Sequence, residues 1–259
     1  MVPNYKADST NSSTLFGRLP SSYTPLAQAS YPAGMGTAGY HSSIGILPEW
    51  DAAFFTTNAD VRAYRSVLIN GYAAGRFGVH FRDENTNLPI RFSSYPNLVV
   101  GEGSSIGSSG ASNTGEQTPN STGVTPPAYN SSHHPSMGYL AYLLTGRQYF
   151  LEELQFVTTL NFLKNSDSAR SNSKGIFLTT AGANTTRGAA WAIRTLAQAA
   201  AVTPDNDPLR TEFVNSINEN IKYYEGRYVS QPTNALGLVQ PYSNYKGTNV
   251  DPHASAIRM

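Results

Sequence analysis

The sequence predicts a mainly α protein in which helical hairpins follow one another along the chain. Apolar residues recur at helical spacing in six segments, and short turns join those segments in pairs. Strand-like alternation is confined to 78–92. Serial hairpins with inner and outer helices are typical of an α/α toroid or an open arc of the same kind. Three hairpins are too few to close a toroid, so either the 259 residues are part of a larger protein or another chain completes the arc.

The first hairpin is predicted over 48–75. Pro48 suits a first helical turn, and it precedes an apolar face that includes Trp50. The chain is expected to turn at Thr57-Asn58 and to begin a second apolar stripe at Val61. The two stripes predict a pair of helices packed against each other.

The second hairpin is predicted over 134–164. His134-Pro135-Ser136 is expected to open its first helix, and Gly146 suits the position just after that helix. The next helix, 149–164, is apolar over much of its circumference, which predicts burial between neighbouring elements.

The third hairpin has the clearest signals. Small residues share one face of the segment 189–200, which allows another helix to approach closely. Asp207-Pro208 is a typical start for the partner helix, whose apolar residues continue in step to Tyr224.

The other segments flank or interrupt this helical domain, which we assign to 47–229. Residues 1–46 carry repeated Gly, Pro and Ser and predict an extended arm, and 78–92 predicts a β-hairpin. In 101–132, 24 of 32 positions are Gly, Ser, Thr, Asn or Pro, so a long loop is expected, either mobile or ordered by a partner or ligand. The tail, 230–259, is expected to be irregular, and it stops without a capping signal, as a truncated chain would.

Composition excludes several classes of protein. Charged residues make up 14% of the chain, against about 25% in a typical domain, and the formal net charge is +1. This balance argues against nucleic-acid binding and against a polybasic membrane-surface protein. The lack of cysteine excludes disulfides, thiolate metal sites and a thiol nucleophile. No apolar run approaches the roughly 18 residues that span a bilayer, and the first residues lack the apolar core of a signal peptide.

No cofactor or metal is expected from the motifs. The chain has no glycine-rich phosphate loop, and its five histidines have no pair at the i, i+4 spacing of a helical metal site. The neutral composition, rich in Tyr, Ser, Thr and Asn, is common in secreted or surface proteins, so we expect an extracellular or cell-surface location.

One helical stripe carries polar groups suited to a ligand. Arg187, Trp191, Arg194 and Gln198 follow at spacings of 4, 3 and 4 and therefore share one face. Such a stripe is either a solvated polar face or the wall of a cavity. In a cavity, an indole beside guanidinium groups suits a sugar ring that bears a carboxylate.

The run Thr186–Arg194 resembles the Arg-Gly-x-x-Trp inner-helix motif of six-hairpin glycosidases, especially unsaturated glucuronyl and rhamnogalacturonyl hydrolases. The resemblance implies an (α/α)6 barrel with Arg187 and Trp191 at the wall of a sugar-binding cavity. Four further segments resemble uncharacterised bacterial proteins of the same toroid class, namely 45–51, 79–83, 134–136 and 149–156.

Glycoside hydrolysis usually needs two carboxyl groups, one of which acts as an acid. Asp51, beside Trp50 near the first helix start, is the preferred acid. Glu152 and Glu153 lie in the predicted buried helix, where pairing with Arg147 or an inner-helix arginine is expected.

Histidine and tyrosine offer another chemistry. His134, near a predicted helix start, or His80, close to Arg82, could be the general base of a polysaccharide-lyase-like reaction. Tyr139 or Tyr142 would then be the acid. Each histidine could equally be a hydrogen-bonded structural residue.

The sequence therefore predicts a carbohydrate-active or carbohydrate-binding protein for an acidic polysaccharide or oligosaccharide, acting as a glycoside hydrolase or polysaccharide lyase if it is an enzyme. The alternative is a non-enzymatic, self-assembling subunit of an extracellular fibre, sheath or particle, joined to further copies through its termini. The predicted catalytic residues are Asp51 and His134, and the predicted substrate-binding residues are Arg187, Trp191, Arg194, Tyr139 and His80.

Overall fold

A computed structural model of the chain describes residues 15–31, 42–95, 98, 129, 133–163 and 186–230. This part is mainly helical, which confirms the predicted fold class at that level. Within it, no helix is long and apolar enough to cross a membrane. The predictions for the loop 101–132, apart from Tyr129, and for the tail after Ser230 lie outside the described residues. The main helices are α2 (Glu49–Thr56), α3 (Val61–Ala73), α4 (Tyr139–Thr145), α5 (Gln148–Leu163), α6 (Thr186–Val202) and α7 (Pro208–Tyr224).

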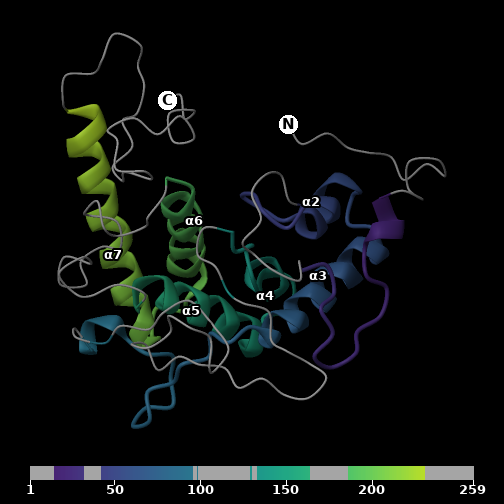
Figure 1. Cartoon of the computed structure of the whole chain (residues 1–259), viewed down its shortest axis with the longest axis horizontal. Helices are drawn as coiled ribbons and strands as arrows, with labels where there is room; N and C mark the ends of the chain where they lie inside the picture. Colours follow the sequence, from purple (N-terminus) through teal and green to yellow (C-terminus); the bar gives the residue numbers. More distant parts are fainter. Residues whose placement is uncertain are drawn as a thin grey trace, which may run out of the picture.

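Each helix packs against the next one in the chain, from α2 on α3 through to α6 on α7. Figure 1 shows α6 and α7 side by side at one end of this series, with α2 and α3 at the other and α5 between them. The helix pairs α2–α3, α4–α5 and α6–α7 are the three predicted hairpins. Contacts between consecutive helices are what a series of αα-hairpins requires.

Local sequence sets several helix ends. The side chain of Asp207 accepts a hydrogen bond from the Leu209 amide at 2.8 Å, and Pro208 occupies the first turn of α7, as predicted. Gly146 ends α4 in the left-handed region, with φ of 65°. Asp60 caps α3 by accepting from the Arg62 amide at 2.8 Å.

The prediction that His134-Pro135-Ser136 opens a helix is wrong. Helix α4 begins only at Tyr139, after Gly138, whose φ of 75° is left-handed. The preceding segment, 133–137, is non-helical and buried. Polar residues are tolerated there because α6 supplies hydrogen-bond partners, as described below.

The predicted β-hairpin over 78–92 is present only as a chain reversal. Among the described residues of this segment, one isolated antiparallel bridge joins Arg82 and Pro89. The Ile90 amide donates to the Phe81 carbonyl at 3.2 Å. Proline has no amide hydrogen to extend the ladder, so paired strands do not form here.

Helix α5 lies in the middle of the core, as its apolar circumference predicted. Its buried side chains include Leu154, Val157 and Leu160, all at most 1% exposed. The ring of Phe162 stacks on Phe92, with centroids 3.9 Å apart and planes 2° from parallel. Burying one such aromatic side chain contributes about 2 kcal/mol.

The described part of the N-terminal arm packs on its own chain. Tyr31 is buried, and its hydroxyl donates to the Asn70 carbonyl of α3 at 3.0 Å. The Ser30 amide donates to the Asn70 side chain at 2.9 Å. The Tyr31 ring packs edge-to-face with the rings of Trp50 and Phe77, each with a centroid separation of 5.2 Å. The arm therefore completes the core around α2 and α3.

The two glycines that flank α4 provide a matched test of this packing. Both have left-handed φ, but a Cβ on Gly138 would collide with the Phe150 carbonyl, whereas nothing lies within 4 Å of a Cβ on Gly146. We expect Gly146→Ala to lower the free energy of unfolding by about 1 kcal/mol. We expect Gly138→Ala to lower it by about 3 kcal/mol, because the collision adds to the backbone strain. Urea unfolding measures both, and equal losses would contradict the packing of α4 on α5.

Candidate functional site

The predicted polar stripe of α6 is mostly buried. Arg194 is 7% exposed, and Trp191 is half-buried. The Arg194 guanidinium donates to the Gly45 carbonyl at 2.7 Å and to the His134 carbonyl at 2.9 Å. The stripe is therefore not a solvated face, because it packs against the irregular segments that precede α2 and α4.

His134 lies inside a network of hydrogen bonds. Its ring is fully buried, and Nε2 is 2.8 Å from the Thr195 hydroxyl oxygen. The Thr195 hydroxyl donates to the Trp191 carbonyl one helical turn earlier, at 3.0 Å. On another side, the Asn161 amide nitrogen lies 3.5 Å from the same Nε2, and Asn161 accepts from the Tyr129 hydroxyl at 2.7 Å. These bonds hold the imidazole in one orientation.

Asp51 lies in the first turn of α2 and is 3% exposed. Burial raises the pKa of Asp51 well above its usual range, and the charge of Arg194 opposes this shift only in part. Burial likewise lowers the pKa of Arg194 to about 10. The cluster thus holds an acid that keeps its proton to a higher pH than an exposed aspartate does.

Two buried nitrogen donors of α6 lack a partner in the described part of the chain. These are Nε1 of Trp191 and Nε of Arg194. The Arg194 guanidinium carbon lies 5.2 Å from the Trp191 ring, so the two groups are neighbours. Buried N–H groups are nearly always paired, and exceptions are concentrated at functional sites. We therefore take Asp51, Trp191 and Arg194, called here the α6 cluster, as the candidate site.

The structure brings some predicted site residues together and separates others. Tyr139 is half-buried against the hydrophobic core at the start of α4. Arg187 lies in the first turn of α6, and its side chain is outside the described part. His80 pairs with α5. The predicted residues that meet around α6 are Asp51, His134, Trp191 and Arg194.

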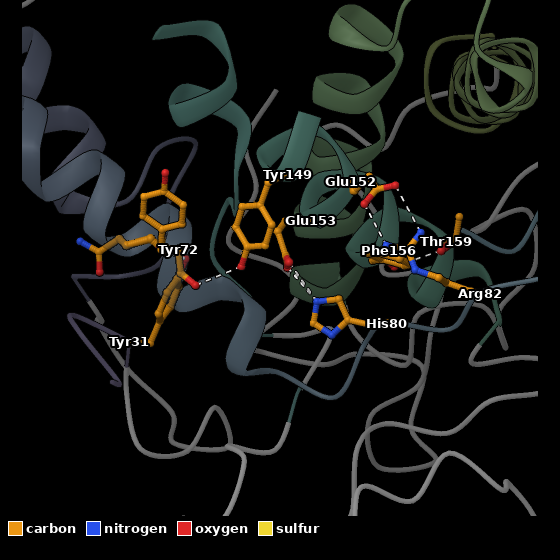
Figure 2. Close-up of polar contacts among 10 residues, drawn as sticks. Tyr31, Tyr72, His80, Arg82, Tyr149, Glu152, Glu153, Phe156 and Thr159 are labelled. Carbon is orange, nitrogen blue, oxygen red and sulfur yellow. Dashed lines mark hydrogen bonds and ion pairs between the residues drawn. The ribbon is translucent and has the colours of Figure 1, made fainter. Parts of the chain in front are cut away.

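The predicted partners of the two glutamates of α5 are wrong. Glu152 pairs with Arg82 at 2.9 Å, and Glu153 lies 3.0 Å from Nε2 of His80 (Figure 2). Arg147 instead contacts the hydroxyl of Tyr72. The two pairs join residues about 70 positions apart, and such contacts have no signal in local spacing.

Sequence analysis also missed the partners of Gln198, the last residue of the predicted α6 stripe. The Ser136 hydroxyl donates to Gln198 at 2.7 Å, and the Gln198 amide nitrogen lies 3.4 Å from the Ile46 carbonyl. The i, i+4 spacing of Arg194 and Gln198 was a usable signal that both face one surface. The identity of that surface depends on segments far away in the sequence.

No protein-family model, curated protein or solved structure matches the chain. Among the described residues, no three His, Asp or Glu side chains gather closely enough to hold a metal ion. The functional argument therefore depends on the geometry of the α6 cluster.

Replacing the buried acid tests the electrostatics of the cluster. The folded chain holds the Asp51 proton more tightly than the unfolded chain, so folding takes up a proton above the ordinary aspartate value of 3.8. The free energy of unfolding of the wild type should then fall, relative to Asp51→Asn, as the pH rises from about 4. The difference is about 1.4 kcal/mol for each unit of pKa shift. Urea unfolding at several pH values measures it.

Asp60→Asn is the matched control with the opposite sign. A hydrogen bond from Arg62 lowers the pKa of Asp60, so the charged form stabilises the folded chain. Its contribution is lost as the pH falls, and it is small because the pair is at the surface. A constant difference between wild type and Asp51→Asn at all pH values would contradict a buried, proton-holding Asp51.

Proposed function

We propose that the chain binds an acidic sugar of the uronate class at the α6 cluster, as a carbohydrate-active or carbohydrate-binding protein. The observation that carries this proposal is the pair of buried, unpartnered N–H groups on the neighbouring side chains of Trp191 and Arg194, and Arg194 also interacts electrostatically with the buried acid Asp51. A carboxylate accepts hydrogen bonds from both kinds of donor, and bonds to guanidinium are charge-assisted.

The shapes of the side chains support the same ligand class. The flat indole of Trp191 can pack against the apolar face of a pyranose ring. Trp191 is the half-buried member of the α6 cluster, so a ligand would approach from its side. Arg187, one helical turn earlier on the predicted stripe, would extend the same surface.

Asp51 and His134 have different roles in this proposal. In a glycoside hydrolase or lyase, the protonated carboxyl group of Asp51 would donate its proton to the leaving glycosidic oxygen. His134 would act as a positioning residue, since its carbonyl accepts from Arg194 and its ring contacts Thr195.

The proposal also includes the arrangement of the helices. Helices that pack consecutively from α2 to α7 support an α/α arc of the six-hairpin type. The low charge content and the Ser, Thr and Asn-rich composition support a bacterial protein located outside the cell or at its surface.

The alternative, a structural subunit of a fibre or sheath, depends on contacts made by the termini. Residues 15–31 of the arm pack on α2 and α3 of their own chain, which favours the sugar-binding proposal. Light scattering across concentration distinguishes the two. A structural subunit should grow into large assemblies, with or without sugar.

Tryptophan fluorescence tests the proposal directly, because the chain has only two tryptophans. In a Trp50→Phe variant, the emission reports Trp191 alone. We expect D-glucuronate to change that emission, because its carboxylate would take up the free indole N–H. At a concentration of about 100 times Kd, the ligand should also stabilise the wild type by about 2.7 kcal/mol.

D-Glucose is the control ligand, and Trp191→Phe is the control variant because it keeps a ring but removes the N–H donor. Glucose should cause no thermal shift in the wild type, and glucuronate should cause none in Trp191→Phe. An equal response to glucose and glucuronate, or an undiminished shift in Trp191→Phe, would overturn the proposed site.

A further inference from the structure

A second polar cluster, separate from the α6 cluster, lies along one side of α5. Tyr149, Glu152, Glu153 and Phe156 follow at spacings that place them on one side of this helix. The extended segment 79–82 lies against that side, as Figure 2 shows. Residues two apart in an extended chain project to the same side, so His80 and Arg82 both face the helix.

His80 and Glu153 form a pair of unequal exposure. Nε2 of His80 is 3.0 Å from both carboxylate oxygens of Glu153. The His80 side chain is 32% exposed, whereas that of Glu153 is 4% exposed. In Figure 2 the second ring nitrogen points away from Glu153. In the tautomer that carries its proton on Nε2, the imidazole donates to the Glu153 carboxylate, and the lone pair of Nδ1 points away from that carboxylate.

Tyr149 lies near Glu153, and its hydroxyl donates a hydrogen bond to the Tyr72 carbonyl. Burial raises the pKa of Tyr149, and the negative charge of Glu153 raises it further, so the hydroxyl stays protonated. That hydroxyl lies against Gly75 and within 3.1 Å of the Tyr72 carbonyl. A Cβ at position 75 would collide with the Tyr149 oxygen. The glycine thus leaves room for a tyrosine beside the buried acid.

Arg82 places a positive charge near the imidazole. Its guanidinium carbon lies 4.7 Å above the centre of the Phe156 ring, and the His80 ring meets the same phenyl ring at 5.0 Å. Two of its nitrogens bond Glu152 at 3.2 and 2.9 Å, which holds the guanidinium in place. The Arg82 side chain is 36% exposed and that of His80 is 32% exposed, so water reaches both the base and the cation.

We propose that this cluster is a hydrolytic site for carboxylic esters, in which His80 is the general base, Glu153 positions it and Arg82 stabilises negative charge on the substrate oxygen. The site is separate from the α6 cluster and does not depend on the proposed uronate binding.

The reaction balances with water as the only co-reactant. Nδ1 of His80 removes a proton from water while the water oxygen bonds to the acyl carbon and the carbonyl electron pair moves to its oxygen. Arg82, which contacts the same phenyl ring as His80, would stabilise that oxyanion. As the carbonyl re-forms, the bond to the alcohol oxygen breaks, and the imidazolium returns its proton to the leaving alkoxide. The products are a carboxylic acid and an alcohol.

The choice of an ester follows from the contacts within the cluster. Glycoside hydrolysis needs a carboxylic acid that carries a proton, but Glu152 and Glu153 both accept hydrogen bonds from positively charged or N–H donors. Both carboxyl groups are already engaged as partners of Arg82 and His80. Hydrolysis of an ester needs a base and a positive group for the oxyanion, and His80 and Arg82 are side chains of these two kinds.

Hydrolysis of 4-nitrophenyl acetate by the full chain tests the proposal. All rates are compared at one pH of about 8, which lies above the ordinary pKa of imidazole. We expect His80→Gln to lower the rate about 100-fold and Glu153→Gln to lower it about tenfold. Glu219→Gln, which breaks an exposed pair with Lys222, is the control variant and should match the wild type.

Further measurements keep the outcome decisive. The wild-type rate should fall in D2O, because a proton moves in the rate-limiting step. An unchanged rate would mean direct attack by the imidazole and would overturn the general-base role. A wild-type rate no higher than that of the same concentration of N-acetylhistidine, or an unaltered rate in His80→Gln, would also overturn the proposal. If His80→Gln fails to fold, carbethoxylation of His80 in the folded wild type replaces that variant. Activity that survives the modification would overturn the proposal.

Discussion

The buried guanidinium of Arg194 links helix α6 to two irregular segments of the chain, one before α2 and one before α4. The irregular segments before α2 and α4 cannot satisfy their own carbonyl groups as a helix does, and Arg194 donates to one carbonyl in each. A buried positive charge is costly unless it is hydrogen-bonded, so the arginine and the two segments stabilise one another. The position of His134, and with it the start of α4, follows from these bonds.

Helix α5 connects the two polar clusters. Its apolar residues fill the core, while one stripe holds His80 and Arg82 at the surface. Tyr31 of the arm is buried against α3, where its hydroxyl donates to the Asn70 carbonyl. Burial raises the pKa of Tyr31, and the charges of Asp51 and Glu153 raise it further. Two acidic side chains thus have different environments, since burial raises the pKa of Asp51, whereas Glu153 lies 3.0 Å from Nε2 of His80.

Local signals in the sequence were sufficient for the helices but not for the segments between them. Periodicity and caps such as Asp207-Pro208 and Gly146 predicted helix positions, because these depend on neighbours within one or two turns. The failure at 134–136 and the missed pairing of His80 with Glu153 have one cause. Each depends on a partner 60 or more positions away, and single-sequence patterns carry no information on such contacts. Of the candidate site, the α6 stripe was predictable from its spacing, whereas its burial was not.

The two clusters differ in what they lack. Each buried, unpaired N–H group on Trp191 and Arg194 costs about 1–3 kcal/mol relative to a satisfied one. A ligand that supplied acceptors would recover that free energy on binding, so the α6 cluster gains most from an anion. The His80–Glu153 pair has no such deficit, because the bond between imidazole and carboxylate is already made. Its imidazole is 32% exposed and has a second ring nitrogen that points away from Glu153, so it suits the proposed transfer of a proton better than the capture of a charge.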